Sequence, residues 1–70
     1  MVMKTTKYKI GEIVLPRFYI AGNPTGLSVD TRSIVKEVRK DLKRLRVERD
    51  DGRLGSWWVD FGAVRKVGEN

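Results

Sequence analysis

Apolar and charged residues alternate in the second half of the chain, and this alternation predicts a β-hairpin. Leu45 and Val47 each stand between charged neighbours over residues 44–49, which is the period of a strand with one face buried. Residues 50–53, Asp-Asp-Gly-Arg, supply a turn with a glycine where a positive φ is needed. We therefore predict a hairpin that joins residues 44–49 to residues 56–59.

The stretch before this hairpin fits two periods. Four apolar residues repeat with spacings of three, four and three: Val35, Val38, Leu42 and Leu45. With a cap at Asp30 or Thr31 this pattern makes an amphipathic helix over residues 31–45, and the fold is then α+β with a C-terminal hairpin. We favour a strand over residues 33–39, paired with the hairpin through a turn at residues 40–41. The step from Val35 to Val38 then requires a bulge.

The remaining segments complete an all-β reading. Residues 8–15 are rich in β-branched and aromatic side chains, with a kink or bulge at Gly11, and Pro16 marks the strand end. Residues 16–33 are dense in glycine and proline but also carry large apolar side chains, which indicates a long folded loop pinned by its own side chains. A last strand at residues 63–67 follows a short turn at 60–62 that suits one coil of 3₁₀ helix.

These segments resemble a known family. Residues 8–14, Tyr-Lys-Ile-Gly-Glu-Ile-Val, are similar to the opening of SH3-like barrels of the KOW and Tudor kind, where an aromatic residue, an apolar residue, a Gly-acidic pair and a Val recur in that order. Residues 35–38, 45–47, 50–52, 57–59 and 64–67 are similar to the later strands and turns of such barrels. Arg32 and Ser33 stand in place of the KOW glycine, and the peptide-binding signatures of signalling SH3 domains are missing apart from the tryptophan pair.

The resemblance implies one five-stranded SH3-like barrel over residues 7–67, with a long folded loop between its first two strands. The ends, residues 1–6 and 68–70, are expected to be frayed. Because this fold hosts unrelated functions, the resemblance leaves the ligand open.

Composition adds a strong positive charge to this picture. Fifteen Lys and Arg against nine Asp and Glu give a net charge of +6 and a pI near 10.1, as in proteins that meet polyanions. The chain has no Cys, which removes disulfides and thiolate chemistry. Its polar N-terminus lacks an apolar signal region, and no run approaches a membrane span. We expect a cytoplasmic protein without a membrane partner.

Catalysis finds little support in the residues. The chain has neither His nor Cys, and no Ser, Thr or Lys is spaced for activation as a nucleophile. Asp50 and Asp51 are adjacent and suit a turn before Gly52 better than a carboxylate pair. No glycine-rich phosphate loop or metal-ligand spacing is present. We expect no enzyme activity, no cofactor and no metal.

The basic run between Arg32 and Arg53 is more informative, with nine cationic against five acidic residues. Such a cluster can neutralise phosphates and release counterions. The predicted nucleic-acid-binding residues are Lys40, Lys43, Arg44, Arg46, Arg49 and Arg53. The alternative is a solvated face on which Glu37, Asp41 and Glu48 pair with the arginines across the strands.

Neighbouring residues of a strand face opposite sides, so only one ring of the pair Trp57 and Trp58 can enter the core. Alternation with Val59 places Trp57 inside and Trp58 on the surface. An exposed Trp58 with Tyr19 can stack nucleobases or anchor a protein, or it can serve as a lid over the long loop. Two functions follow. The first is a small domain that binds DNA or RNA, and the alternative is an interaction module, of the kind that phage genomes encode, that binds an acidic partner protein through Trp58 and the long loop.

Overall fold

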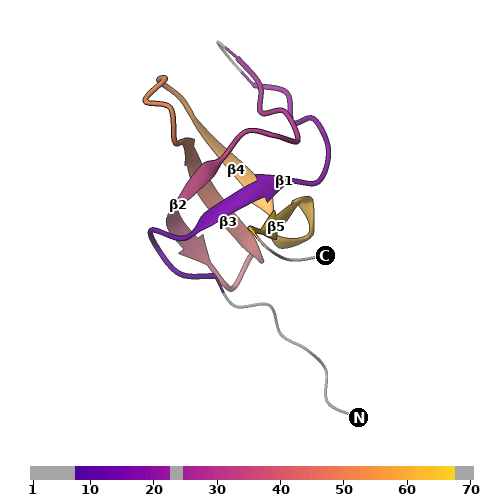
Figure 1. Ribbon diagram of the computed structural model, residues 1–70. Helices are drawn as coiled ribbons and strands as arrows, with labels where there is room; N and C mark the ends of the chain where they lie inside the picture. Colours follow the sequence, from indigo (N-terminus) through magenta and orange to yellow (C-terminus); the bar gives the residue numbers. More distant parts are fainter. Residues whose placement is uncertain (1–7, 23–24, 68–70) are drawn as a thin grey trace.

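Five antiparallel strands in one sheet make up the part of the chain described by a computed structural model, residues 8–22 and 25–67. The strands are β1 (Ile13–Pro16), β2 (Ser33–Arg39), β3 (Arg44–Arg49), β4 (Ser56–Asp60) and β5 (Val64–Lys66), with one 3₁₀ turn, η1 (Phe61–Ala63), before β5. Their order in the sheet is β4-β3-β2-β1-β5 (Figure 1). The all-β prediction is confirmed, as an open sheet in which β4 and β5 are the two edges.

The ambiguous stretch is a strand, a turn and a strand, so the helix over residues 31–45 is wrong. β2 and β3 pair from Ser33 with Arg49 to Arg39 with Arg44. The register shifts between Val35 and Glu37, and this bulge confirms the irregular step that the strand reading requires. The extra residue returns Val38 to the inner face opposite Leu45. Val35 and Val38 can therefore both face the core of a strand although three residues separate them, a spacing that is typical of a helix.

The first strand is shorter than predicted. It begins at Ile13 instead of residue 8, because residues 9–12 form a turn in which Glu12 N–H donates to Lys9 C=O at 3.1 Å. Gly11 takes a φ of 93° there, a conformation that glycine adopts without strain. The expected end at Pro16 is confirmed.

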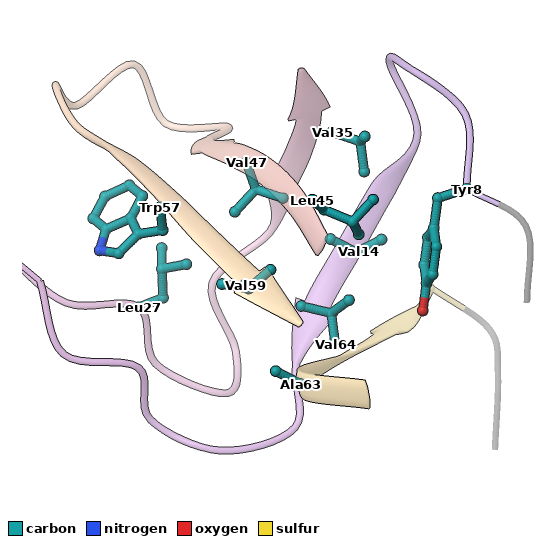
Figure 2. Packing of buried hydrophobic residues seen from close by; sticks show 10 residues of the cluster. All are labelled: Tyr8, Val14, Leu27, Val35, Leu45, Val47, Trp57, Val59, Ala63 and Val64. Carbon is teal, nitrogen blue, oxygen red and sulfur yellow. The ribbon is translucent and has the colours of Figure 1, made fainter. Parts of the chain in front are cut away.

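The core lies on the inner face of the sheet (Figure 2). It consists of ten buried residues: Tyr8, Val14, Leu27, Val35, Leu45, Val47, Trp57, Val59, Ala63 and Val64. Trp57 is 6 % exposed and Trp58 is 46 % exposed, as the alternation predicts. The hairpin of β3 and β4 is also confirmed, with Gly52 at a φ of 82° in its turn.

The long loop packs on the same inner side of the sheet. Ile20 and Leu27 form an isolated antiparallel bridge across it, and Leu27 is fully buried. Gly22 lies against the indole Nε1 of Trp57, where a Cβ would overlap the ring. Phe18 and Tyr19 stay exposed, so Ile20 and Leu27 are the apolar side chains of the loop that pack against the core.

The end of the chain follows the prediction closely. The 3₁₀ turn is confirmed, and the last strand spans three residues, Val64–Lys66, where residues 63–67 were expected. The expected fraying at residues 1–6 and 68–70 lies outside the described residues. Over residues 8–22 and 25–67, no helix has the length and apolarity needed to cross a bilayer.

Candidate nucleic-acid interface

Two of the predicted arginines share the outer face of β3, and both are bound to carboxylates. Arg46 Nε lies 3.3 Å from Glu37 Oε1 and its Nη1 lies 3.0 Å from Glu48 Oε2. Arg44 Nε lies 3.2 Å from Asp60 Oδ1 on β4. On this outer face, the positive charges of Arg44 and Arg46 are therefore compensated by carboxylates of the same strand and of the two neighbouring strands.

Arg49 and Arg53 lie at the other end of β3, beside the β3–β4 turn. Arg49 Nη2 is 2.7 Å from Asp51 Oδ2, and its Nη1 donates to the Gly26 carbonyl at 3.2 Å. The Arg49 side chain is only 15 % exposed. It thus joins the turn to the long loop, and Arg53 lies 3.8 Å from the same carboxylate of Asp51.

The electrostatics of this turn are visible in the pKa of Asp51. Hydrogen bonds from the Arg49 side chain, and then from the Arg53 backbone N–H, lower the Asp51 pKa from 3.8 to about 2. The same pairing raises the pKa of Arg49. Both pKa shifts show that the hydrogen-bonded pair favours the charged form of each side chain, as expected for opposite charges in contact.

The end of the molecule formed by the long loop and the β3–β4 turn carries balanced charge. A hollow there of about 320 Å³ is lined by two arginines, three aspartates, a serine and a threonine: Arg32, Arg49, Asp30, Asp50, Asp51, Ser28 and Thr31. Arg32 Nε is 3.5 Å from Asp50 Oδ2. We call this region the loop end; with Arg53 it has as many cations as carboxylates.

The opposite end of the sheet keeps an excess of positive charge. Four exposed lysines there have no carboxylate within ion-pairing distance among the described residues: Lys9, Lys36, Lys40 and Lys43. We call these four residues the lysine end. Three further cations that the structure describes in this region are each paired with a carboxylate: Arg39 with Asp41, Arg44 with Asp60, and Lys66 with Glu12.

Contacts of Phe61 connect the β2–β3 turn to the segment that precedes Lys9. Phe61 N–H donates to Lys43 C=O at 2.9 Å, and Tyr8 Oη donates to Phe61 C=O at 3.1 Å. The Tyr8 and Phe61 rings also pack, with centroids 5.2 Å apart. Phe61 thereby fixes the turn that carries Lys43 next to the segment that carries Lys9.

Lys36 lies at the bulge in the middle of β2, level with Arg46 and Val47, and borders the lysine end through the Lys9 turn. Gly11 N–H donates to Val35 C=O at 2.7 Å, so the turn after Lys9 lies beside the residue that precedes Lys36. The bulge sets Lys36 outside the regular pairing of β2 with β3. Its side chain is exposed, and it faces solvent near the Lys9 turn.

The six predicted phosphate-binding residues thus divide between two ends. Lys40, Lys43 and Arg44 lie at the lysine end, whereas Arg49 and Arg53 lie at the loop end, about 16 Å along β3 at the usual strand rise. Arg46 lies between them. Lys9 was missed because it lies outside the run from Arg32 to Arg53, whereas Lys36 lies within that run but was not assigned to the phosphate-binding set.

The two predicted stacking residues belong to different surfaces. Tyr19 lies on the long loop, where its hydroxyl contacts Gly26. Trp58 projects from the outer face of β4, opposite Arg46 on β3, whereas the loop packs on the inner side with Trp57. The two rings do not form a joint platform.

The described residues contain no cluster of three or more carboxylate, His or Cys groups suited to a metal ion. Comparisons with protein-family models, with curated proteins and with solved structures gave no match to this chain.

Proposed function

We propose that this protein binds the phosphate backbone of nucleic acids through the lysine end. The observation that carries the proposal is the separation of charge. Carboxylates pair with the arginines of β2, β3 and the loop end, whereas four exposed lysines near the opposite end have no such pair among the described residues. Phosphates would replace the counterions that these lysines otherwise hold.

The residue type favours backbone contact over reading of bases. Lysine is a flexible, strongly hydrated point charge, while base edges are read by planar or bidentate groups. The arginines that could supply such groups, Arg44 and Arg46, are held by Asp60, Glu37 and Glu48. The proposed binding is therefore independent of sequence, with no base contact assigned to Trp58 or Tyr19.

The proposed architecture is a small SH3-like barrel. Three features support it: five antiparallel strands, the long loop between the first two strands, and the 3₁₀ turn before the last strand. Tyr8, Gly11 and Glu12, which carry the resemblance of the first segment, lie at the turn that presents Lys9. The barrel would thus use its opening turn and its β2–β3 turn together.

The test is a titration of labelled single- and double-stranded oligonucleotides followed by fluorescence anisotropy. A Lys40→Ala, Lys43→Ala double variant removes two charges from the lysine end, and we expect it to lower the affinity at least tenfold. A matched Arg32→Ala, Arg53→Ala double variant removes two charges from the loop end. We expect it to bind nearly as the wild type, because these two arginines are already paired with aspartates. The variant should also stay folded, since exposed ion pairs contribute little to stability.

Equal losses in the two double variants would mean that net charge alone attracts the ligand, and the assigned site would be wrong. No oligonucleotide binding at low salt would refute the function. The lysines would then be expected to bind an acidic protein partner, which is the alternative prediction.

A further inference from the structure

The two edges of the sheet differ in how they are protected against pairing with another chain. β5 has three residues, two of them Arg65 and Lys66, and short basic edges resist association. β4 has five residues, Ser-Trp-Trp-Val-Asp. It contains no Lys, Arg or Pro and no bulge, and its one charged residue, Asp60, stands at its end, so the middle of β4 lacks the devices that keep an edge strand single.

One backbone hydrogen bond defines which groups of β4 face the open edge. Phe61 N–H donates to Lys43 C=O, so Asp60 and Arg44 are a non-hydrogen-bonded pair of the antiparallel ladder. By alternation Trp58 and Arg46 are another. The N–H groups of Ser56, Trp58 and Asp60, and the carbonyls of Ser56 and Trp58, therefore point away from β3.

Nothing else in the described chain pairs with this edge. β3 is the single neighbour of β4 in the sheet, and no other backbone segment among residues 8–22 and 25–67 bonds to Ser56 or Trp58. The side chains of Ser56, Trp58 and Asp60 are all exposed. The edge is an unsatisfied template for one more strand.

We propose that the strand added here is β4 of a second copy, running antiparallel about a two-fold axis at Trp58. Trp58 sits at the centre of β4 and directs both its N–H and its C=O outward. In this register it exchanges both bonds with the partner's Trp58. The N–H of Asp60 donates to the carbonyl of Ser56 of the partner subunit, and the two sheets become continuous.

Side chains and charges are complementary in this register. Ser56 faces the partner's Asp60, whose carboxylate accepts a hydrogen bond from the Ser56 hydroxyl, and no like charges stand directly opposite each other. The antiparallel arrangement sets the lysine end of each copy beside the neutral loop end of the other. The two positive ends therefore stay apart, and their repulsion does not oppose dimerisation at close range.

Exposed apolar side chains gain cover as well. The two Trp58 rings become cross-strand neighbours on the outer face, an arrangement that stabilises antiparallel pairs.

Sedimentation equilibrium over a range of protein concentrations tests the dimer, and charge exchange at Trp58 tests its register. Trp58→Arg and Trp58→Glu each place like charges on the axis, and we expect either variant alone to dimerise more than about tenfold more weakly, the loss of a central aromatic contact. An equimolar mixture should regain dimer, because opposite charges then face each other. Phe18→Arg, at an exposed aromatic of the long loop, should dimerise as the wild type.

A wild-type protein that stays monomeric at all accessible concentrations would overturn the proposal. So would a dimer that tolerates both Trp58 variants, or a mixture that fails to regain dimer. Should a Trp58 variant not fold, amide hydrogen exchange of the wild type decides instead: the N–H groups of Trp58 and Asp60 must gain protection as the concentration rises. Unchanged exchange there would also refute the dimer.

Discussion

At the scale of single residues, the tryptophan pair separates stability from surface chemistry. Trp57 packs among the long loop, Gly22 and Gly55, so Trp57→Ala removes a core ring. We expect a loss of about 3–5 kcal/mol in the free energy of unfolding, enough to unfold a domain of this size. Trp58→Ala should cost much less, because nearly half of that side chain is already in water.

Urea unfolding followed by circular dichroism measures both losses, at a protein concentration low enough to keep the chain monomeric. Equal losses for Trp57→Ala and Trp58→Ala would mean that both rings are structural. An edge with a structural Trp58 would have no free aromatic at its centre, and the two-fold register proposed above would lose its main contact.

At the scale of elements, Arg49 connects three of them: β3, the β3–β4 turn and the long loop. Its pair with Asp51 makes the turn sensitive to acid. The Asp51 pKa is about 2 in the folded chain against 3.8 for a free side chain. Because the folded pKa is the lower one, this carboxylate stabilises the fold fully above about pH 4, and the contribution is lost as the pH falls through 2.

We expect Arg49→Gln to return the Asp51 pKa most of the way to 3.8, measured by NMR titration of the carboxyl carbon. Asp41 is the internal control, since its pKa is lowered by its hydrogen bond with Arg39 on a different turn. The Asp41 pKa should stay low in the variant. An Asp51 pKa that remains near 2 would show that the Arg53 backbone N–H, the next contributor, dominates instead.

At the scale of the whole molecule, the separation of charge determines how binding responds to salt. Each lysine that contacts a phosphate should contribute about 0.9 to the slope of log affinity against log salt on duplex DNA, and about 0.7 on a single strand. The Lys40→Ala, Lys43→Ala variant should therefore lower the duplex slope by up to about 1.8. The same anisotropy titration, repeated at several salt concentrations, measures it.

The loop-end variant Arg32→Ala, Arg53→Ala should leave that slope unchanged. Binding that persists at high salt, or that depends strictly on one base sequence, would contradict backbone recognition. Such binding would instead be assigned to Arg44 and Arg46 on the outer face. Their guanidinium groups would first have to separate from Glu37, Glu48 and Asp60.

Much of the fold was predictable because its signals are local. Alternation over residues 44–49, the Asp-Asp-Gly turn and the pair Trp57 and Trp58 act within a few residues, and the hairpin and its inner face agree with them. The bulge in β2 was also predictable, since the spacing of Val35 and Val38 has no other reading in a strand. The start of β1 was not, because the Lys9 to Glu12 turn competes with strand formation through a hydrogen bond that composition does not reveal.

The sequence by itself determined the hairpin of β3 and β4 with one aromatic ring inside and one outside, because side-chain direction in a strand depends only on parity along the chain. Residues 31–45 fitted a helix as well as a strand, and the pairing of β2 with β3 decided between them. Only the tertiary structure decided where the charges balance. Ion pairing depends on which strands become neighbours: Arg46 meets Glu37 across β2, and Arg44 meets Asp60 across β4. The same pairing leaves the lysines at one end and β4 open, since a sheet order is a property of contacts distant in sequence.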